Sequence, residues 1–213
     1  MRKCMVLIMF VSLLLVGCST HRVQLAYSPP PSRSSATLPA IMVGEFTDLR
    51  GRDALRNNGT WIGAIRGGYG NTFKTVLLEQ PVHEVVTAIF TEALQARDAL
   101  ADPHDDDTTL VLSGSVITFS CKQYMRRDCL ITLNVILSDR ATQNKIFEKQ
   151  YEVYKFDGSV WAIDTGIFGS VNKLRDLAAR TLSACVDKAL DDGELINAAI
   201  HPKTTLQHSR GRK

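Results

Sequence analysis

Hydrophobic residues recur at helical spacing in two stretches of this 213-residue chain. In residues 81–99 they repeat every three or four positions after Pro81, and proline is favoured in the first turn of a helix. Residues 170–191 show the same spacing before Gly193, a residue type common at helix C-caps. We therefore predict two amphipathic helices. Their apolar stripes are Val82, Val85, Val86, Ile89, Phe90, Ala93 and Leu94 in the first, and Val171, Leu174, Ala178, Leu182, Cys185, Ala189 and Leu190 in the second.

Four other stretches are rich in the β-branched, aromatic or alternating residues that are typical of strands. Short polar connections at 125–128 and 138–144 predict hairpins between the last three. Residues 51–73 are interpreted as a long loop, because glycine and asparagine cluster there. The order β-α-β-β-β-α indicates an α+β fold, with two helices on one face of an antiparallel sheet of about four strands. The predicted strands cover residues 38–46, 109–124, 129–137 and 145–156.

The N-terminus has the features of a secretory signal. Two basic residues precede an apolar run over residues 4–16, which is too short to span a bilayer. The run leads into Leu15-Val16-Gly17-Cys18, which resembles the lipobox of bacterial lipoproteins. The resemblance implies that signal peptidase II recognises Leu15, Val16 and Gly17, removes residues 1–17, and leaves Cys18 acylated. The alternatives are an uncleaved anchor and an ordinary signal that contains a cysteine by chance.

The residue after Cys18 is Ser19 and not Asp. In Gram-negative lipoproteins this implies export to the outer membrane, with the protein facing the periplasm and membrane lipid as its first partner. Residues 18–37 are rich in Ser, Pro and Thr, so we expect a lipidated cysteine followed by a disordered tether. Residues 38–200 are expected to form a single domain, and residues 201–213 a basic disordered tail.

The positive charge of the chain belongs to its two ends. Eight of the 25 Lys and Arg residues lie in 1–37 and 201–213, which contain no acid. The predicted domain therefore carries 17 bases against 22 acids. A nucleic-acid-binding protein needs a basic patch on its folded body, so we expect no nucleic-acid partner.

The glycine-rich stretch before Lys74 does not have the spacing of a phosphate-binding loop, because Lys74 comes four residues after Gly70. Its apolar residues are the candidates for partner contact, since exposed aromatic residues on a loop suit protein binding. The alternative is that they fold back over the sheet as a lid. They are Trp61, Ile65, Tyr69 and Phe73.

Cys121 and Cys129 lie symmetrically about Met125, so a hairpin that turns there would place them opposite each other. An oxidising periplasm would favour a disulfide between them, and two separate buried thiols are the alternative. Cys185 falls on the apolar stripe of the second helix and is expected in the core. A bond between two chains through this thiol is a further alternative.

The chain contains none of the familiar catalytic motifs that combine a nucleophile or a metal with its base. Asp48 and Arg50 are interpreted as a structural ion pair. His104 precedes three consecutive acids, but one contiguous run offers no fixed coordination geometry, and a solvated loop is the preferred interpretation. We therefore expect no enzyme activity, metal, cofactor or small-molecule substrate.

Several short motifs resemble the YajG-type family of uncharacterised lipoproteins. They are the strand that ends in Phe46-Thr47-Asp48-Leu49-Arg50, the glycine-rich loop, the helix from Pro81 and the turn Leu137-Ser138-Asp139-Arg140-Ala141-Thr142. More distantly they resemble the α+β domain of the curli-secretion lipoprotein CsgG and the amino-terminal part of TolB. The resemblance implies a non-catalytic adaptor or scaffold that binds another envelope protein. The alternative is a subunit of an oligomeric secretion or transport assembly of the CsgG type.

Overall fold

The fold is that of a computed structural model, which describes residues 19–30, 38–67, 69–102, 108–158 and 169–202. A seven-stranded sheet runs through the molecule in the order β1-β4-β3-β5-β6-β7, and β2 pairs with β5. Its strands are β1 (Ser19–Val23), β2 (Met42–Asp48), β3 (Trp61–Arg66), β4 (Thr72–Leu78), β5 (Leu110–Gln123), β6 (Arg127–Asp139) and β7 (Lys145–Asp157).

The sheet is mixed, so the predicted antiparallel sheet of about four strands is wrong, although the α+β class holds. The pairs β1–β4, β2–β5 and β3–β5 are parallel, and β3–β4, β5–β6 and β6–β7 are antiparallel. Parallel pairs join segments that are distant in the sequence. A short polar connection predicts a hairpin, but the sequence has no comparable local pattern for a parallel strand pair. The parallel pairs were therefore not predicted.

The predicted loop over 51–73 contains two short helical turns, α2 (Arg52–Leu55) and η1 (Arg56–Gly59), the whole of β3 and the start of β4. Its glycines partly serve close packing. A Cβ atom on Gly63 would lie 1.6 Å from the backbone oxygen of Cys121 on the neighbouring strand. Only glycine lets the two backbones approach this closely. The glycine content that indicated a loop is therefore partly a condition for strand pairing.

Strand β5 is long enough to have two different neighbours along one edge. Its first half pairs with β2, from Val111 to Val116. Its last residues pair with β3, from Cys121 to Gln123. The other edge of β5 pairs with β6 along its whole length. The long β5–β6–β7 meander is thus the central scaffold of the fold, and β3, β4 and β1 extend it at one end.

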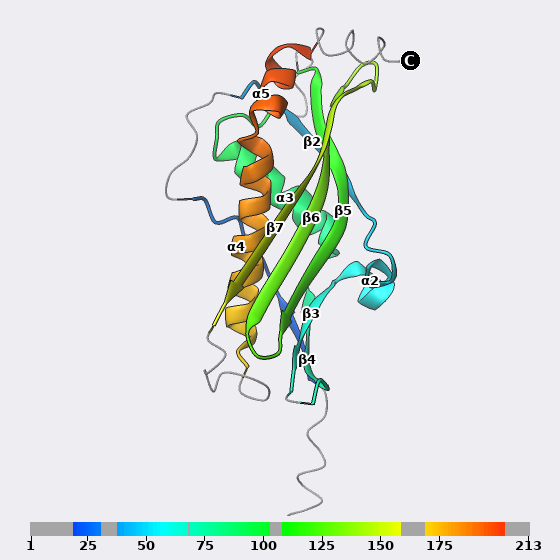
Figure 1. Ribbon diagram of the computed structural model, residues 1–213. Coiled ribbons are helices and arrows are strands. Elements are labelled where there is room, and N and C mark those ends of the chain that lie inside the picture. The colour runs from blue at the N-terminus through cyan, green and yellow to red at the C-terminus, as the bar shows by residue number, and fades with distance from the viewer. Residues whose placement is uncertain (1–18, 31–37, 68, 103–107, 159–168, 203–213) are drawn as a thin grey trace, which may run out of the picture.

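Two long helices, α3 (Val82–Gln95) and α4 (Val171–Leu190), cover one face of the sheet (Figure 1). Both predicted helices are confirmed at these positions, and their apolar stripes are buried except for Val171, which is half-buried. The Ser170 side chain caps α4 by accepting a hydrogen bond from the backbone N–H of Lys173. Gly193 does not end a helix as predicted, because it begins the short α5 (Gly193–Ile200), which Asp192 caps. In the described part of the chain, no helix combines the length and hydropathy of a membrane span.

Residues expected to form a tether belong to the domain. Ser19–Val23 pairs with β4 as an edge strand of the sheet. Leu25 and Tyr27 pack against the hydrophobic core. The folded domain therefore includes residues before the predicted boundary at residue 38, and the tether prediction is wrong for this part of the chain. Most of the predicted basic tail lies outside the described residues.

Candidate functional site

One row of paired residues crosses the sheet and defines the end at which the N-terminus lies. Ser19 pairs with Lys74, Lys74 with Ile65, and Ile65 with Gln123. Gln123 then pairs with Arg127, and Arg127 with Asp157. Two hairpin turns continue beyond this row, at residues 66–73 and 124–126. We call this region the Ser19 end of the sheet.

The predicted lipidation site precedes the Ser19 end by one residue. Cys18 and the expected peptidase-recognition residues Leu15, Val16 and Gly17 lie outside the described residues. Strand β1 starts at Ser19. A group attached to Cys18 would therefore lie within one residue of the row that contains Ser19, at the end of the sheet where both hairpin turns project.

The four residues predicted for partner contact lie in three different settings on the β3–β4 hairpin. Ile65 is fully buried in the core, so its assignment to an exposed contact or a lid is wrong. Trp61 is half-buried, with the Arg56 guanidinium 4.8 Å from its ring centre. Phe73 is half-buried and packs over Gly67. Tyr69 alone among the four is fully exposed, at the hairpin turn.

The β5–β6 turn and the adjoining end of β7 carry a second group of exposed apolar residues, which were not among the predicted contact residues. The Arg126 guanidinium lies 4.7 Å from the ring centre of Phe156 and donates a hydrogen bond to the Tyr154 hydroxyl at 3.1 Å. We call this group the aromatic patch. Its apolar members are 40–58% exposed. The aromatic patch consists of Tyr124, Met125, Arg126, Tyr154 and Phe156.

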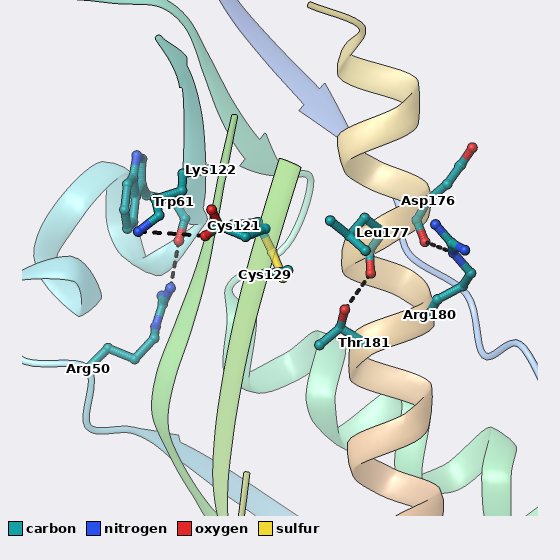
Figure 2. The surroundings of a disulfide bond; sticks show 10 residues. Arg50, Trp61, Cys121, Lys122, Cys129, Asp176, Leu177, Arg180 and Thr181 are labelled. Carbon is teal, nitrogen blue, oxygen red and sulfur yellow. Dashed lines mark hydrogen bonds and ion pairs between the residues drawn. A yellow bond between two sulfur atoms is a disulfide. The ribbon is translucent and has the colours of Figure 1, made fainter. Parts of the chain in front are cut away.

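A disulfide joins Cys121 and Cys129 just inside this turn (Figure 2). The two cysteines are direct partners across β5 and β6, and their Cα atoms are 4.0 Å apart. Next to them on the same strands, Lys122 and Asp128 form an ion pair at 3.6 Å. The bond closes the base of the turn that presents the aromatic patch.

Arg50 fastens the segment after β2 to the β3 strand. Its guanidinium binds Asp48 through two nitrogens, at 2.8 and 2.7 Å. It also donates to the backbone oxygen of Trp61 at 2.6 Å (Figure 2). A further hydrogen bond goes to the backbone oxygen of Gly59 at 2.8 Å. The predicted structural ion pair is confirmed, and the same guanidinium holds the backbone at Gly59 and Trp61 in place.

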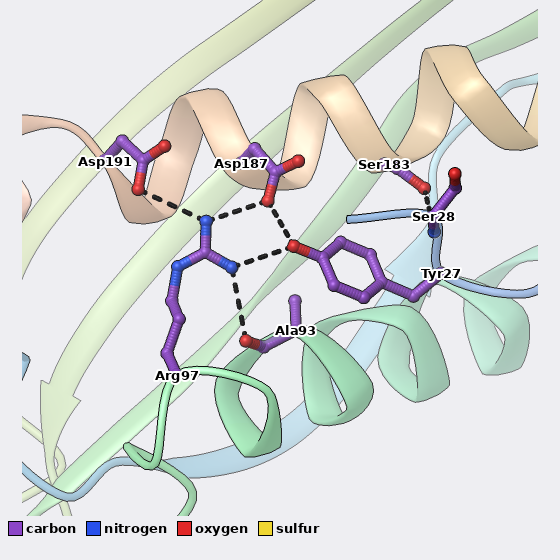
Figure 3. Close-up of polar contacts among 7 residues, drawn as sticks. All are labelled: Tyr27, Ser28, Ala93, Arg97, Ser183, Asp187 and Asp191. Atoms are coloured by element: carbon purple, nitrogen blue, oxygen red, sulfur yellow. Dashed lines mark hydrogen bonds and ion pairs between the residues drawn. The ribbon is translucent and has the colours of Figure 1, made fainter. Parts of the chain in front are cut away.

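A partly buried polar cluster fastens residues 24–28 to the helices (Figure 3). The Tyr27 hydroxyl donates to Asp187 Oδ1 at 2.6 Å and accepts from Arg97 at 3.0 Å. Arg97 also binds Asp187 at 2.8 Å and Asp191 at 3.2 Å. Burial, and then the hydrogen bond to Asp187, raise the pKa of Tyr27 above its ordinary value. One feature of the sequence indicated this cluster, namely the single tyrosine, Tyr27, in a polar and proline-rich stretch.

A hollow of about 460 Å³ lies between this N-terminal segment and α3, lined by residues that include Leu25, Glu79 and Glu92. Both acids already have partners. Glu79 accepts a hydrogen bond from Gln24, and Glu92 accepts one from the backbone N–H of Tyr27 at 2.9 Å. The hollow is therefore explained by the way residues 24–27 lie over the helix.

The predicted core position of Cys185 is confirmed, since its side chain is fully buried. Burial raises the pKa of its thiol to about 12. His104 and the three acids after it lie outside the described residues. Among the residues that the structure does describe, no three His, Cys, Asp or Glu side chains gather as a metal site.

In the part of the chain that the structure describes, no long helix lies over the sheet face opposite α3 and α4 (Figure 1). In its middle, polar side chains of β5, β6 and β7 lie side by side. Asn134 donates to Glu148 at 2.8 Å, and the Thr132 hydroxyl donates to Glu152 at 3.2 Å. The members on β7 are exposed, and those nearer the centre are half-buried or buried. We call this set the open face, and it consists of Ser115, Thr132, Asn134, Glu148, Gln150 and Glu152.

Neither a protein-family model nor a curated protein matches this sequence. Solved structures do match its fold. Protein XCC0632 from Xanthomonas campestris, of family model DUF330, is 13% identical, with a TM-score of 0.55, 91% of this chain covered and 100% of that chain. An uncharacterized protein is 8% identical, with a TM-score of 0.51 and coverage of 80% and 95%. At these identities the matches show a shared fold.

A weaker match is lipoprotein GNA1162 from Neisseria meningitidis, at 11% identity. It covers 68% of this chain and 96% of that one, with a TM-score of 0.27. That score is too low to establish a common fold. The resemblance to YajG-type lipoproteins and to CsgG stays a prediction from the sequence.

Proposed function

We propose that this protein is a non-catalytic lipoprotein of the bacterial envelope, anchored in the outer membrane through acylated Cys18. The lipobox-like Leu15-Val16-Gly17-Cys18 after an apolar run supports the anchor. The position of β1 is compatible with it, because the strand starts at Ser19, directly after the cysteine that would carry the acyl chains. Two or three acyl chains would hold the protein stably at the membrane.

We further propose that the domain is an adaptor that binds another envelope protein through the open face. The observation that supports this is a broad sheet surface that no long helix covers among the described residues, with hydrogen-bonding side chains at fixed positions on it. Glu148, Gln150 and Glu152 project from one strand at every second residue, as the pleat requires. Rigid, polar surfaces of this kind suit non-obligate interfaces, which are about as polar as the rest of a protein surface.

Site-specific photo-crosslinking in intact cells tests the adaptor function. A photoreactive residue at Gln150 should give a discrete adduct with one envelope protein, identified by mass spectrometry. The control position is Gln95, which is exposed on α3, on the opposite side of the molecule. Asn134→Arg in the Gln150-labelled chain should abolish the adduct. Equal adducts from both positions, or an adduct that survives Asn134→Arg, would contradict binding through the open face.

The second candidate function is a subunit of an oligomeric secretion or transport assembly. It is favoured by one observation. In the described part of the chain, the 13-residue strand β7 pairs with β6 alone, and such an edge can accept a strand from another copy. Light scattering of the lipidated protein in mild detergent separates the two functions. A large ring would favour the assembly, and a monomer or dimer the adaptor.

A further inference from the structure

We propose that the Ser19 end of the sheet is a lipid-binding surface, which seats the domain directly on the membrane. This inference rests on the proposed function, since it needs Cys18 to carry the acyl chains. The occupant we assign is a bilayer interface that contains anionic lipid. The surface consists of the β3–β4 turn, with Tyr69 at its tip, and the aromatic patch.

The first support is the length of chain between the anchor and the fold, which is one residue. Ser19 is already paired with Lys74 in the sheet, so no linker separates the lipidated cysteine from the domain. The β3–β4 turn extends beyond this row from Arg66 to Phe73. The chain runs outward over the first half of these residues and returns over the second half. At roughly 3.3 Å per residue, the tip of the turn lies about 10 Å beyond the level of Ser19. With Cys18 at the headgroups, the tip of this turn has to enter the interface.

The second support is the chemistry of that tip. Between Arg66 and Lys74 the sequence carries no charge. Tyr69 is fully exposed and touches nothing that would bury its ring. Gly70 has φ +81°, and its backbone N–H donates to the oxygen of Gly67 at 2.8 Å. An uncharged turn that presents a tyrosine suits the interface, where amphipathic aromatic rings lie at headgroup level.

The third support is that the aromatic patch is at the same level. The row that contains Ser19 also contains Gln123 and Arg127, which flank the β5–β6 turn. Three inter-strand steps separate β1 from β5, a lateral distance of about 15 Å. The anchor, the Tyr69 turn and the aromatic patch can therefore contact one flat surface together. In Figure 1 the β3–β4 and β5–β6 turns project from the same end of the molecule.

The fourth support is charge. Residues 66–74, 122–128 and 153–158 contain six Lys or Arg residues and two Asp. Both acids are ion-paired, Asp128 with Lys122 and Asp157 with Arg127 and Arg180. Basic residues near a bilayer are attracted to anionic lipids, and long basic side chains keep their charges in the headgroups while their stems lie on apolar surface.

Depth-dependent fluorescence quenching tests the inference on the full-length, lipidated protein. An environment-sensitive fluorophore is attached at Met125→Cys in the β5–β6 turn, or at Ala141→Cys, an exposed position in the β6–β7 turn. Strand β6 has 13 residues, so the two turns lie roughly 40 Å apart. The vesicles contain phosphatidylethanolamine, phosphatidylglycerol and a lipid with a nitroxide in its headgroup region. We expect quenching at position 125 to exceed that at position 141 by about fivefold, because interfacial elements insert 5–10 Å.

Introducing Tyr69→Ser and Phe156→Ser into the protein labelled at position 125 should reduce its quenching at least about twofold. The lipid-binding surface then loses two of its aromatic side chains. The mass of the Cys18 peptide is measured on the same samples. An unmodified Cys18 would contradict the proposed anchor and the inference that depends on it. Acylated Cys18 with equal quenching at positions 125 and 141 would overturn the inference alone and leave the anchor in place.

Discussion

The hydroxyl group of Tyr27 donates a hydrogen bond to Asp187 Oδ1 at 2.6 Å, although the two residues are 160 positions apart. Arg97 completes the cluster by binding both partners. The segment directly after β1 is therefore also attached to the fold, through contacts of Tyr27 with residues on α4 and just after α3. Both of these segments were expected to be disordered. The contacts make the N-terminal segment a part of the fold whose contribution to stability can be measured.

Replacing Asp187 should destabilise the protein strongly. Arg97 and Asp187 are 10% and 11% exposed, and removal of one partner leaves a charge with little water around it. We expect Asp187→Ala to lower the free energy of unfolding by about 3 kcal/mol, the low end for such pairs, because Asp191 still contacts Arg97. Urea unfolding of the purified domain measures the change. A loss below roughly 1 kcal/mol, the value of an exposed ion pair, would contradict this account.

Tyr27→Phe should reveal the pH dependence of the cluster. At pH 8 the variant loses a hydrogen bond to a charged group, which is worth about 1.5 kcal/mol. The pKa of Tyr27 is raised in the folded state, so its contribution is complete below pH 10 and is lost as the pH rises through the folded value. The stability gap between wild type and Tyr27→Phe should narrow above pH 10. Tyr69→Phe, at a fully exposed position, should match wild type throughout, and a gap independent of pH would argue against the assigned cause.

The disulfide should contribute measurably to stability. It closes a loop with a sequence separation of 8, for which loop entropy predicts about 2.5 kcal/mol. The double variant Cys121→Ser with Cys129→Ser should lose that amount in urea unfolding. Reductant should destabilise wild type by a similar amount and leave the double variant unchanged. If reductant acts equally on both proteins, the effect does not come from this bond.

Gly63 should tolerate no side chain. A Cβ atom there would meet the Cys121 backbone oxygen at 1.6 Å, and backbone paired on both sides cannot move away. We expect Gly63→Ala to cost about 3 kcal/mol or more. Gly193→Ala is the matched control, since a Cβ atom there has no neighbour within 4 Å. It should be neutral or stabilising by about 0.5 kcal/mol. Thermal unfolding of the two variants compares them directly.

Cys18→Ala should release the protein from the membrane fraction. The described strands and helices all lie after this residue, so we expect the released chain to keep the circular dichroism spectrum and unfolding midpoint of the mature protein. Fractionation of cells that express either form, with metabolic labelling by a fatty acid, measures both properties. Fatty acid on the Cys18→Ala chain would contradict acylation at Cys18.

The parts of the fold that follow from local pattern were predictable. The apolar spacing around Ile89 and Leu182 located both long helices, and the alternation around Leu133 located the meander of β5, β6 and β7. The strands that were missed depend on distant partners. Ser19–Val23 has the sequence of a polar loop and becomes a strand only because the edge of β4 is free. Gly63 weakens the strand pattern of β3, yet the approach of Cys121 requires it.

The candidate site shows the same division. The disulfide pair could be chosen from its spacing about Met125, whereas Cys18 rests on the resemblance to a lipobox and lies outside the described residues. Ile65 was misplaced because an apolar residue between glycines gives no sign of the side on which its strand will be buried. Tyr154 and Phe156 were missed for the opposite reason. Alternation predicts which residues share a face, but whether a helix covers that face depends on the packing of the whole domain.

The direction of β1 decides how the molecule would respond to mechanical force. A pull through Cys18 would act along the axis of a five-residue strand, away from the sheet. In that geometry the hydrogen bonds to β4 are loaded together in shear, whereas a strand pulled sideways opens one bond at a time. The next segment, with Tyr27 fixed between α3 and α4, would take up the load only after β1 had slipped. An anchored domain built in this way would withstand tension between the membrane and whatever it holds.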